Sequence, residues 1–105
     1  MEGNGPVAGT PKPCGLLIAG TNPVAVDFAC TKLLGFDFQK IPLVKRAFEK
    51  HRLSLIEGLP EDIQVLSNCE LWEKPLEEWT VKDSLNFKPH FGWIGFVEMV
   101  DGEVQ

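Results

Sequence analysis

The feature that most constrains the fold is an uninterrupted apolar run at residues 14–20, CGLLIAG, which is bracketed by Pro13 and Gly20. A run of this length with such flanks is typical of a strand that is buried on both faces. Strands of that kind occur in parallel sheets with helices packed on both sides. The run therefore predicts an α/β fold built around a parallel sheet.

A helix is predicted directly after this strand, because TNPVAVDFACTKLLG carries both a start signal and a stop signal. Asn22 is suited to cap the helix, Pro23 to take its first position and Gly35 to end it. Apolar residues recur within it at helical spacing and are expected to face the core. They are Val26, Ala29, Cys30 and Leu33, with Ala25 and Phe28 widening the stripe.

Two further elements follow along the chain. Residues 41–51 predict a second, surface helix, with Pro42 near its start and Val44 and Phe48 four positions apart. Residues 63–67, IQVLS, lie between Pro60 and Asn68 and predict another strand.

The predicted fold is a small parallel or mixed sheet with two packed helices, in the order β-α-α-β, followed by an irregular aromatic C-terminal arm. Residues 72–90 mix prolines, acids and aromatics without a steady period, and predict an irregular connection with a short strand near residues 80–81. Residues 91–100 contain two glycines and predict a last strand at a sheet edge.

Length and charge limit the classes of function. The 105 residues suffice for one domain, so residues 1–105 are expected to form a single α/β domain. Fifteen acidic residues outnumber ten basic ones, giving a net charge of -5, so neither nucleic acid nor an anionic membrane is expected as a partner. The apolar runs are too short to span a bilayer, and the N-terminus lacks a signal-peptide pattern. These features predict a cytoplasmic protein.

The turn between the predicted strand and helix, AGTNPVAVD, is the first candidate ligand site. Such a turn directs unpaired backbone N–H groups and the positive end of the helix dipole toward the carboxyl edge of the sheet. A carboxylate or phosphate is expected to bind there, with Thr21 and Asn22 as additional donors. Both residues are equally suited to forming a turn and a cap, so a structural turn is the alternative.

Asp27 is the second candidate, because it lies within the otherwise apolar stretch VAVDFAC. A buried carboxylate has to be paired, hydrogen-bonded or protonated. Asp27 therefore either faces water beside Thr31 and Lys32 or meets a donor from another segment. In the second case it would order the opening loop of the chain.

The opening segment, MEGNGPVAGTP, is the third candidate. Its glycine spacing differs from that of the common phosphate-binding loops, and it leads toward a strand. Its small residues let the backbone approach a ligand closely, so Gly3, Asn4 and Gly5 are candidate ligand-binding residues, with Glu2 beside them. A lid over a ligand and a plain connection are both compatible with this composition.

No metal site is predicted within the chain. Cys14, Cys30 and Cys69 are far apart and form no C-x-x-C pair, while His51 and His90 each lack a second histidine at helical spacing. Reduced, mostly buried thiols are expected instead.

Several of these motifs together resemble the C-terminal part of a family called domain of unknown function 362. The resemblance rests on MEGNGPVAGTPKP, the apolar run, AGTNPVAVD, KIP and the closing FKPHFGWIG, and extends over residues 1–95. The residues that match the shared pattern are Glu2, Gly3, Gly5, Pro6, Asn22, Pro23 and Asp27.

The resemblance implies that these residues are the C-terminal fragment of a longer protein. Some members of the family carry iron–sulfur modules, which implies a redox setting, with any iron–sulfur cluster elsewhere in the parent protein and no cofactor within this chain. The implied partners are the rest of the parent chain or a redox partner. The family has no settled activity, so no reaction is implied.

Three functions are compatible with these features. The first is a module that binds a small anion or an organic acid, or serves as a scaffold, within a larger iron–sulfur-associated protein; Thr21 and Asn22 would donate to the ligand, the glycine loop would close over it and Asp27 would order the loop. The second is part of a redox or carbon–acid enzyme completed by a missing N-terminal half, with Asp27 or Glu2 as base or metal ligand. The third is a structural or protein-docking domain whose aromatic tail contacts a partner. Whether the chain is an enzyme is left open.

Overall fold

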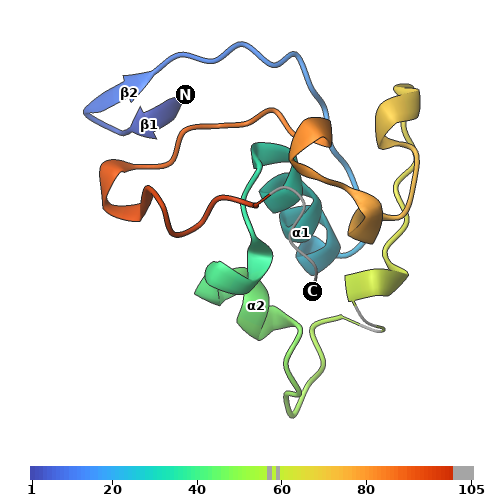
Figure 1. The fold of residues 1–105 in the computed structure, drawn as a ribbon. Helices are drawn as coiled ribbons and strands as arrows, with labels where there is room; N and C mark the ends of the chain where they lie inside the picture. Colours follow the sequence, from blue (N-terminus) through green and yellow to red (C-terminus); the bar gives the residue numbers. More distant parts are fainter. Residues whose placement is uncertain (57, 59, 101–105) are drawn as a thin grey trace.

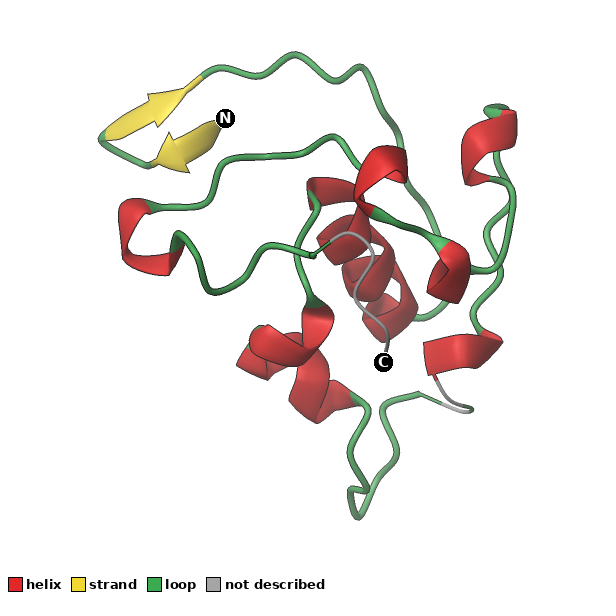
Figure 2. Ribbon diagram, in the orientation of Figure 1, coloured by secondary structure: helices red, strands yellow, loops and turns green. Residues whose placement is uncertain are grey.

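The computed structural model describes residues 1–56, 58 and 60–100, and places one central helix among shorter elements (Figure 1). Strands β1 (Glu2–Asn4) and β2 (Ala8–Thr10) come first, followed by helices α1 (Pro23–Leu34) and α2 (Pro42–Ala47). Loops make up most of the remaining chain (Figure 2). They are interrupted by single-turn 3-10 helices at Phe38–Lys40, Pro60–Asp62, Glu70–Trp72, Leu76–Glu78, Val81–Asp83 and Phe91–Trp93.

Helix α1 begins and ends where the sequence predicts. The side chain of Asn22 accepts hydrogen bonds from the backbone N–H groups of Val24 and Ala25, at 2.8 and 3.3 Å, and Pro23 occupies the first turn. At the other end Gly35 adopts a left-handed conformation with a φ of 90°, which glycine reaches without steric cost. Local signals of the chain therefore set both ends of the helix.

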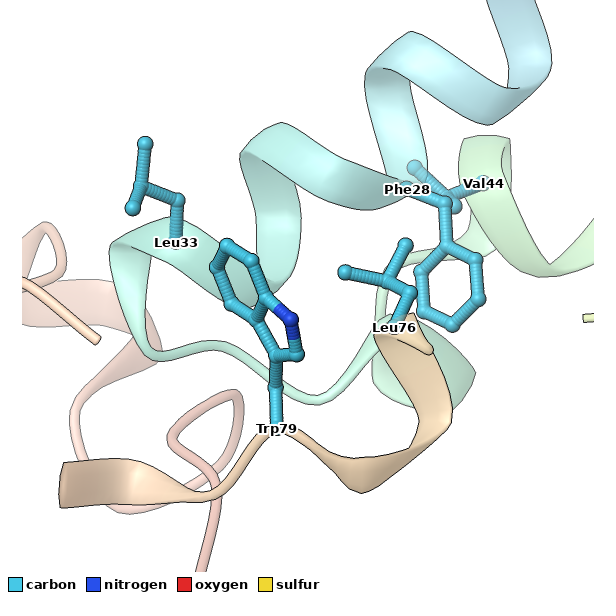
Figure 3. Close-up of a cluster of buried hydrophobic side chains, with 5 residues drawn as sticks. All are labelled: Phe28, Leu33, Val44, Leu76 and Trp79. Atoms are coloured by element: carbon cyan, nitrogen blue, oxygen red, sulfur yellow. The ribbon is translucent and has the colours of Figure 1, made fainter. Parts of the chain in front are cut away.

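The hydrophobic core gathers on one side of α1 (Figure 3). Phe28 and Leu33 of α1 pack with Leu76 and Trp79 from the C-terminal half and with one residue of α2, Val44. Leu76 is completely buried. Of the predicted core face, Leu33 is buried, whereas Val26, Ala29 and Cys30 are only half-buried and Phe28 is buried more deeply than expected.

The predicted parallel or mixed sheet and the order β-α-α-β are not confirmed. The sheet has two antiparallel strands, β1 and β2, with Glu2 opposite Thr10, and it is formed by the segment that was expected to be a glycine loop. Residues 14–20 pair with no strand among the described residues, and residues 63–67 form one isolated bridge, Gln64 with Pro75. A strand buried on both faces requires neighbouring strands, and the described chain supplies none to residues 14–20.

The C-terminal half also differs in detail from the prediction. Helix α2 ends at Ala47, earlier than the predicted residue 51. Residues 72–90 are irregular as expected, but a 3-10 helix replaces the short strand near residues 80–81. Residues 91–100 form no edge strand; they contain a 3-10 helix and one bridge, Glu98 with Phe36. No helix in the described ranges is both long and apolar enough to cross a membrane.

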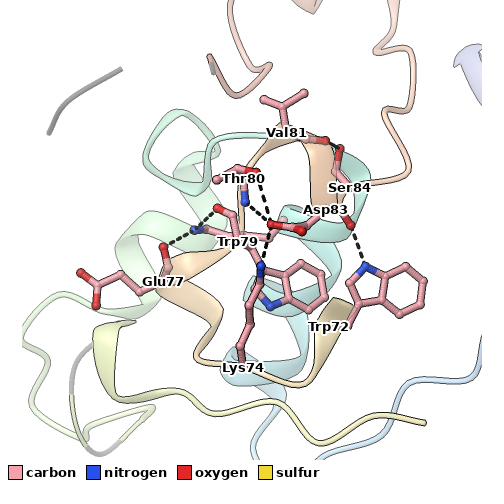
Figure 4. Close-up of polar contacts among 9 residues, drawn as sticks. Trp72, Lys74, Glu77, Trp79, Thr80, Val81, Asp83 and Ser84 are labelled. Atoms are coloured by element: carbon pink, nitrogen blue, oxygen red, sulfur yellow. Dashed lines mark hydrogen bonds and ion pairs between the residues drawn. The ribbon is translucent and has the colours of Figure 1, made fainter. Parts of the chain in front are cut away.

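A buried carboxylate, Asp83, holds several turns of this half together (Figure 4). Its Oδ2 accepts hydrogen bonds from the Thr80 N–H at 2.8 Å and from the Lys74 ammonium at 3.0 Å. Its backbone carbonyl accepts one from the indole N–H of Trp72 at 2.6 Å. Burial acts to raise the pKa of Asp83, but the bonds from Thr80 and Lys74 outweigh it, so the pKa lies below its usual value.

The lowered pKa of Asp83 predicts a loss of stability in acid. The stabilisation is fully present above the unfolded-state pKa of about 3.9 and is lost as the pH falls through the lower folded-state pKa. Urea denaturation of the unmodified chain and of Asp83→Asn, at a series of pH values from about 7 to about 2, measures this. The difference in unfolding free energy between the two proteins should shrink below about pH 4. A difference that does not change with pH would contradict this assignment.

Candidate functional site

The start of α1, predicted to bind an anion, has its donors already satisfied. The N–H groups of Val24 and Ala25 donate to the side chain of Asn22, and that of Val26 donates to the Asn22 carbonyl at 3.1 Å. Pro23 has no N–H group. An anion at this helix end would have to displace Asn22, whose Nδ2 also donates to the carbonyl of Leu55 at 3.1 Å. Asn22 therefore acts here as a cap and a link to a neighbouring loop.

Thr21 and Asp27 both face solvent. Thr21 is exposed, and its hydroxyl bonds to no described residue. The Asp27 side chain is exposed as well and has no ion pair or hydrogen-bond partner among the described residues; its backbone carbonyl accepts a bond from the Thr31 hydroxyl at 2.8 Å. Of the two alternatives for Asp27, the one in which it faces water is correct, and it does not order the opening loop.

The β1–β2 hairpin binds the C-terminal segment of the chain. The Glu2 carboxylate accepts hydrogen bonds from the Lys88 N–H at 2.8 Å and from the Lys12 ammonium at 3.5 Å. The Gly3 N–H donates to the Lys88 carbonyl at 2.8 Å, and the Asn4 side chain accepts from the Phe91 N–H at 2.9 Å. The bond from Lys88 is the main reason that the pKa of Glu2 is lowered.

The hairpin and the start of α1 lie in different parts of the fold (Figure 1). The segment that the hairpin binds is attached to the last turn of α1, where the N–H groups of Leu85 and Phe87 donate to the Leu33 and Leu34 carbonyls. Helix α1 has 12 residues, which corresponds to a length of about 18 Å. Gly5, in the hairpin turn, is therefore not placed to close over Asn22. The hairpin lines neither the cavity beside α1 nor the one around Lys32. A single pocket formed by both turns stays a prediction.

Within the described ranges, no three His, Cys, Asp or Glu residues are grouped as metal ligands. All three cysteines are free: Cys14 is exposed, contrary to the expectation of buried thiols, and Cys30 and Cys69 are half-buried. Burial, and secondarily the charge of Asp27, raise the pKa of the Cys30 thiol.

A cavity of about 630 Å³, which we call the neutral groove, opens beside α1. Residues 15–22 line it on one side and residues 63–68 on another. The remaining lining comes from Ala25, Val26, Ala29 and Leu33 of α1 and from Trp72 and Trp79. None of the described residues that line it carries a charge, although 24% of the residues in the chain are charged. Its volume lies within the range of ligand-binding cavities.

Two walls of the neutral groove expose apolar side chains. Leu17 is 97% exposed and Leu66 is 90% exposed, while Leu16 and Ile18 are each 40% exposed. No backbone N–H or C=O group of residues 14–20 is hydrogen-bonded to a described residue. The sequence feature that indicates this site is the apolar run itself. The run predicts a strand that is buried on both faces, whereas the structure leaves it exposed.

A second cavity, of about 430 Å³, surrounds Lys32. The Lys32 ammonium donates to the backbone carbonyls of Glu77 and Trp79 at 3.3 and 3.4 Å. Burial lowers the pKa of Lys32, against the opposing effect of nearby carboxylates such as that of Glu77. Four acidic residues of the described part of the chain line this cavity, namely Asp37, Glu61, Glu77 and Glu78. Lys32 ties α1 to residues 77–79, and the acidic lining is unsuited to an anionic ligand.

Comparison with known proteins bears on the first third of the chain. The family model described as Domain of unknown function (DUF362) matches residues 1–32. The resemblance seen in the motifs is confirmed over these residues, which include the hairpin, the apolar run and most of α1. No curated protein and no solved structure matches the chain. The description of the family assigns no activity, so function has to be argued from the site.

The contacts of Asn22 predict that it contributes to stability more than its neighbours do. Asn22→Ala removes the helix cap and is expected to lower the free energy of unfolding by about 1 kcal/mol. Thr21→Ala and Asp27→Asn, at exposed positions, should leave it unchanged. Urea denaturation of the three variants measures these effects. A larger loss for Asp27→Asn than for Asn22→Ala would show that Asp27 has a structural partner after all.

Proposed function

We propose that this chain is a scaffolding module that binds the uncharged, apolar part of another molecule in the neutral groove. One observation carries the proposal: the most apolar run of the sequence, residues 14–20, lies exposed along the groove. Covering a leucine side chain contributes about 1.5–3 kcal/mol. Leu17 and Leu66, both almost fully exposed, therefore offer a substantial gain to a molecule that covers them.

The chemistry of the groove supports this class of partner. Contiguous exposed apolar surface in a protein marks sites of interaction. The groove offers uncharged polar groups, including Thr21, Gln64 and Ser67, and no group among its described residues that would neutralise a charged ligand. A charged group placed there would lose its hydration without gaining a counter-ion.

Anion binding and catalysis have less support from the contacts. The donors at the start of α1 are occupied by Asn22, and the cavity around Lys32 is acidic. Asp27 is exposed and isolated from the glycine hairpin. The Glu2 carboxylate is held by Lys88 with a lowered pKa, which makes it a weak base.

The family resemblance supports the proposal that the module belongs to a larger iron–sulfur-associated protein, with any cluster outside this chain.

A second surface has a specific observation in its favour. The closing aromatic segment leaves Phe91, Trp93, Ile94 and Phe96 exposed, by 69%, 44%, 65% and 51%. Such a surface is suited to protein docking, the third function considered from the sequence. Substitution of Trp93 therefore distinguishes binding at this aromatic surface from binding in the neutral groove.

Nile red, an uncharged apolar dye, tests the proposal directly. It should bind the chain with enhanced fluorescence, and Leu17→Asp and Leu66→Asp should weaken that binding about tenfold, which corresponds to about 1.4 kcal/mol, because each places a charge on a wall of the groove. Val7→Asp is the matched control, since Val7 is also 97% exposed but lies in the hairpin turn. Trp93→Ala should have no effect.

Three results would contradict the proposal. The first is the absence of dye binding, and the second is binding that Trp93→Ala abolishes, which would assign it to the aromatic surface. The third is saturable binding of inorganic phosphate or acetate at the start of α1, detected by amide chemical shifts of residues 21–27.

A further inference from the structure

We infer that the occupant of the neutral groove is an extended, uncharged apolar strand of a partner polypeptide, held by main-chain hydrogen bonds to residues 14–20. This inference rests on the proposed function, because it names the partner of the same groove. It is carried by the backbone of the groove wall, by the faces of residues 14–20 and by the charge of the lining.

The backbone of residues 14–20 is the first argument. These seven residues have no hydrogen bond from their N–H or C=O groups to a described residue. An open run of such groups is the template that an added strand recognises. Gly15 has a left-handed φ of 65°, so the continuous edge is residues 16–20, and five residues at strand geometry span about 17 Å, at a rise of about 3.3 Å each. A small ligand can satisfy only a few groups along that length, whereas a strand in register can satisfy the whole edge.

The two faces of the run are the second argument. Successive side chains of an extended segment point to opposite faces, and the exposure alternates accordingly: Leu16 and Ile18 are less than half as exposed as Leu17. Gly20 lies close to α1, because a Cβ atom there would come within 2.8 Å of Val26 Cγ2. The C-terminal end of the run is thus held against α1 while its backbone groups stay unpaired, an arrangement suited to receiving a further strand.

Charge complementarity is the third argument. The lining of the neutral groove has no charged side chain among its described residues, while the chain as a whole carries a net charge of -5. A lysine or glutamate of an incoming strand would lose its hydration in the groove without a partner charge. An acidic segment would in addition be repelled by the net charge of the module. The groove therefore selects a strand with uncharged, apolar side chains.

A second copy of the same chain fits this site less well. Its residues 14–20 are equally apolar, but they are flanked by their own α1 and by their own residues 63–68. Such a segment is not free to enter a groove between the corresponding walls of another copy. The partner is therefore assigned as a polypeptide segment other than a second copy of residues 1–105, and self-association is an outcome that the test must detect.

The test uses a capped, uncharged seven-residue peptide of alternating valine and threonine as the probe. It should displace Nile red from the chain and slow the amide hydrogen exchange of residues 14–20. The same peptide N-methylated at every second residue keeps its side chains but loses half of its N–H donors, and its affinity should fall at least about tenfold. A version with lysine in place of threonine should bind as weakly as the methylated one.

The outcomes separate this inference from the proposed function. If Nile red binds in the groove but the peptide neither displaces it nor protects residues 14–20, the inference is overturned while the proposed function stands. Equal affinity of the methylated and unmethylated peptides also overturns it, since main-chain bonding would then be unimportant. A dimer in sedimentation velocity that Leu17→Asp dissociates would identify a second copy as the occupant and overturn the assignment of a different polypeptide. Peptide binding is read directly by amide exchange, so it is measured even if the dye does not bind.

Discussion

The last turn of α1 is the anchor on which most of the structure depends. The carbonyl groups at the end of a helix have no partner within the helix and have to be satisfied from elsewhere. Here the N–H groups of Leu85 and Phe87 donate to the Leu33 and Leu34 carbonyls, at 2.7 and 2.8 Å, and that of Met99 donates to the Gly35 carbonyl at 2.8 Å. These bonds bring the C-terminal half of the chain onto α1, where Leu76 and Trp79 complete the core. The hairpin then attaches to that half through Lys88 and Phe91.

The same arrangement explains why one part of the chain stays open. Strands β1 and β2 pair with each other, and the hairpin also binds residues 88–91. Helices α1 and α2 each pack one side against the core. Residues 14–20 are left without a strand to pair with among the described residues. An apolar run with a free backbone edge is costly to expose and is normally covered. The proposed scaffolding role follows from this exposed and unpaired apolar run. The family match over residues 1–32 includes the whole run.

Sequence reasoning was most successful where the determining interaction is local. Asn22, Pro23 and Gly35 define α1 through contacts within a few residues, and both helix ends are as predicted. It was least successful where the partner is distant. Glu2 is a candidate catalytic residue and Asn4 a candidate ligand-binding residue from the sequence, but their oxygens accept bonds from Lys88 and Phe91, more than eighty positions away. Spacing along the chain carries no information on such contacts.

The apolar run shows a different limit of prediction. Its composition indicates a segment made to be covered on both faces, but composition does not specify which polypeptide covers it. Asp83 is a similar case: the sequence analysis predicts a short strand near residues 80–81, and neither the cap that Asp83 forms with Thr80 nor its bond from Lys74 is part of that prediction.

Amide hydrogen exchange of the isolated chain, followed residue by residue by NMR, tests the central claim most directly. If the backbone of residues 14–20 is unpaired, its amides should exchange at nearly the rate of an unfolded chain, while the interior amides of α1, such as those of Phe28 and Thr31, are strongly protected. Protection of residues 15–20 equal to that of α1 would show that these residues already have hydrogen-bond partners within the chain. The neutral groove would then have no open edge, and it could not bind a partner strand through its backbone.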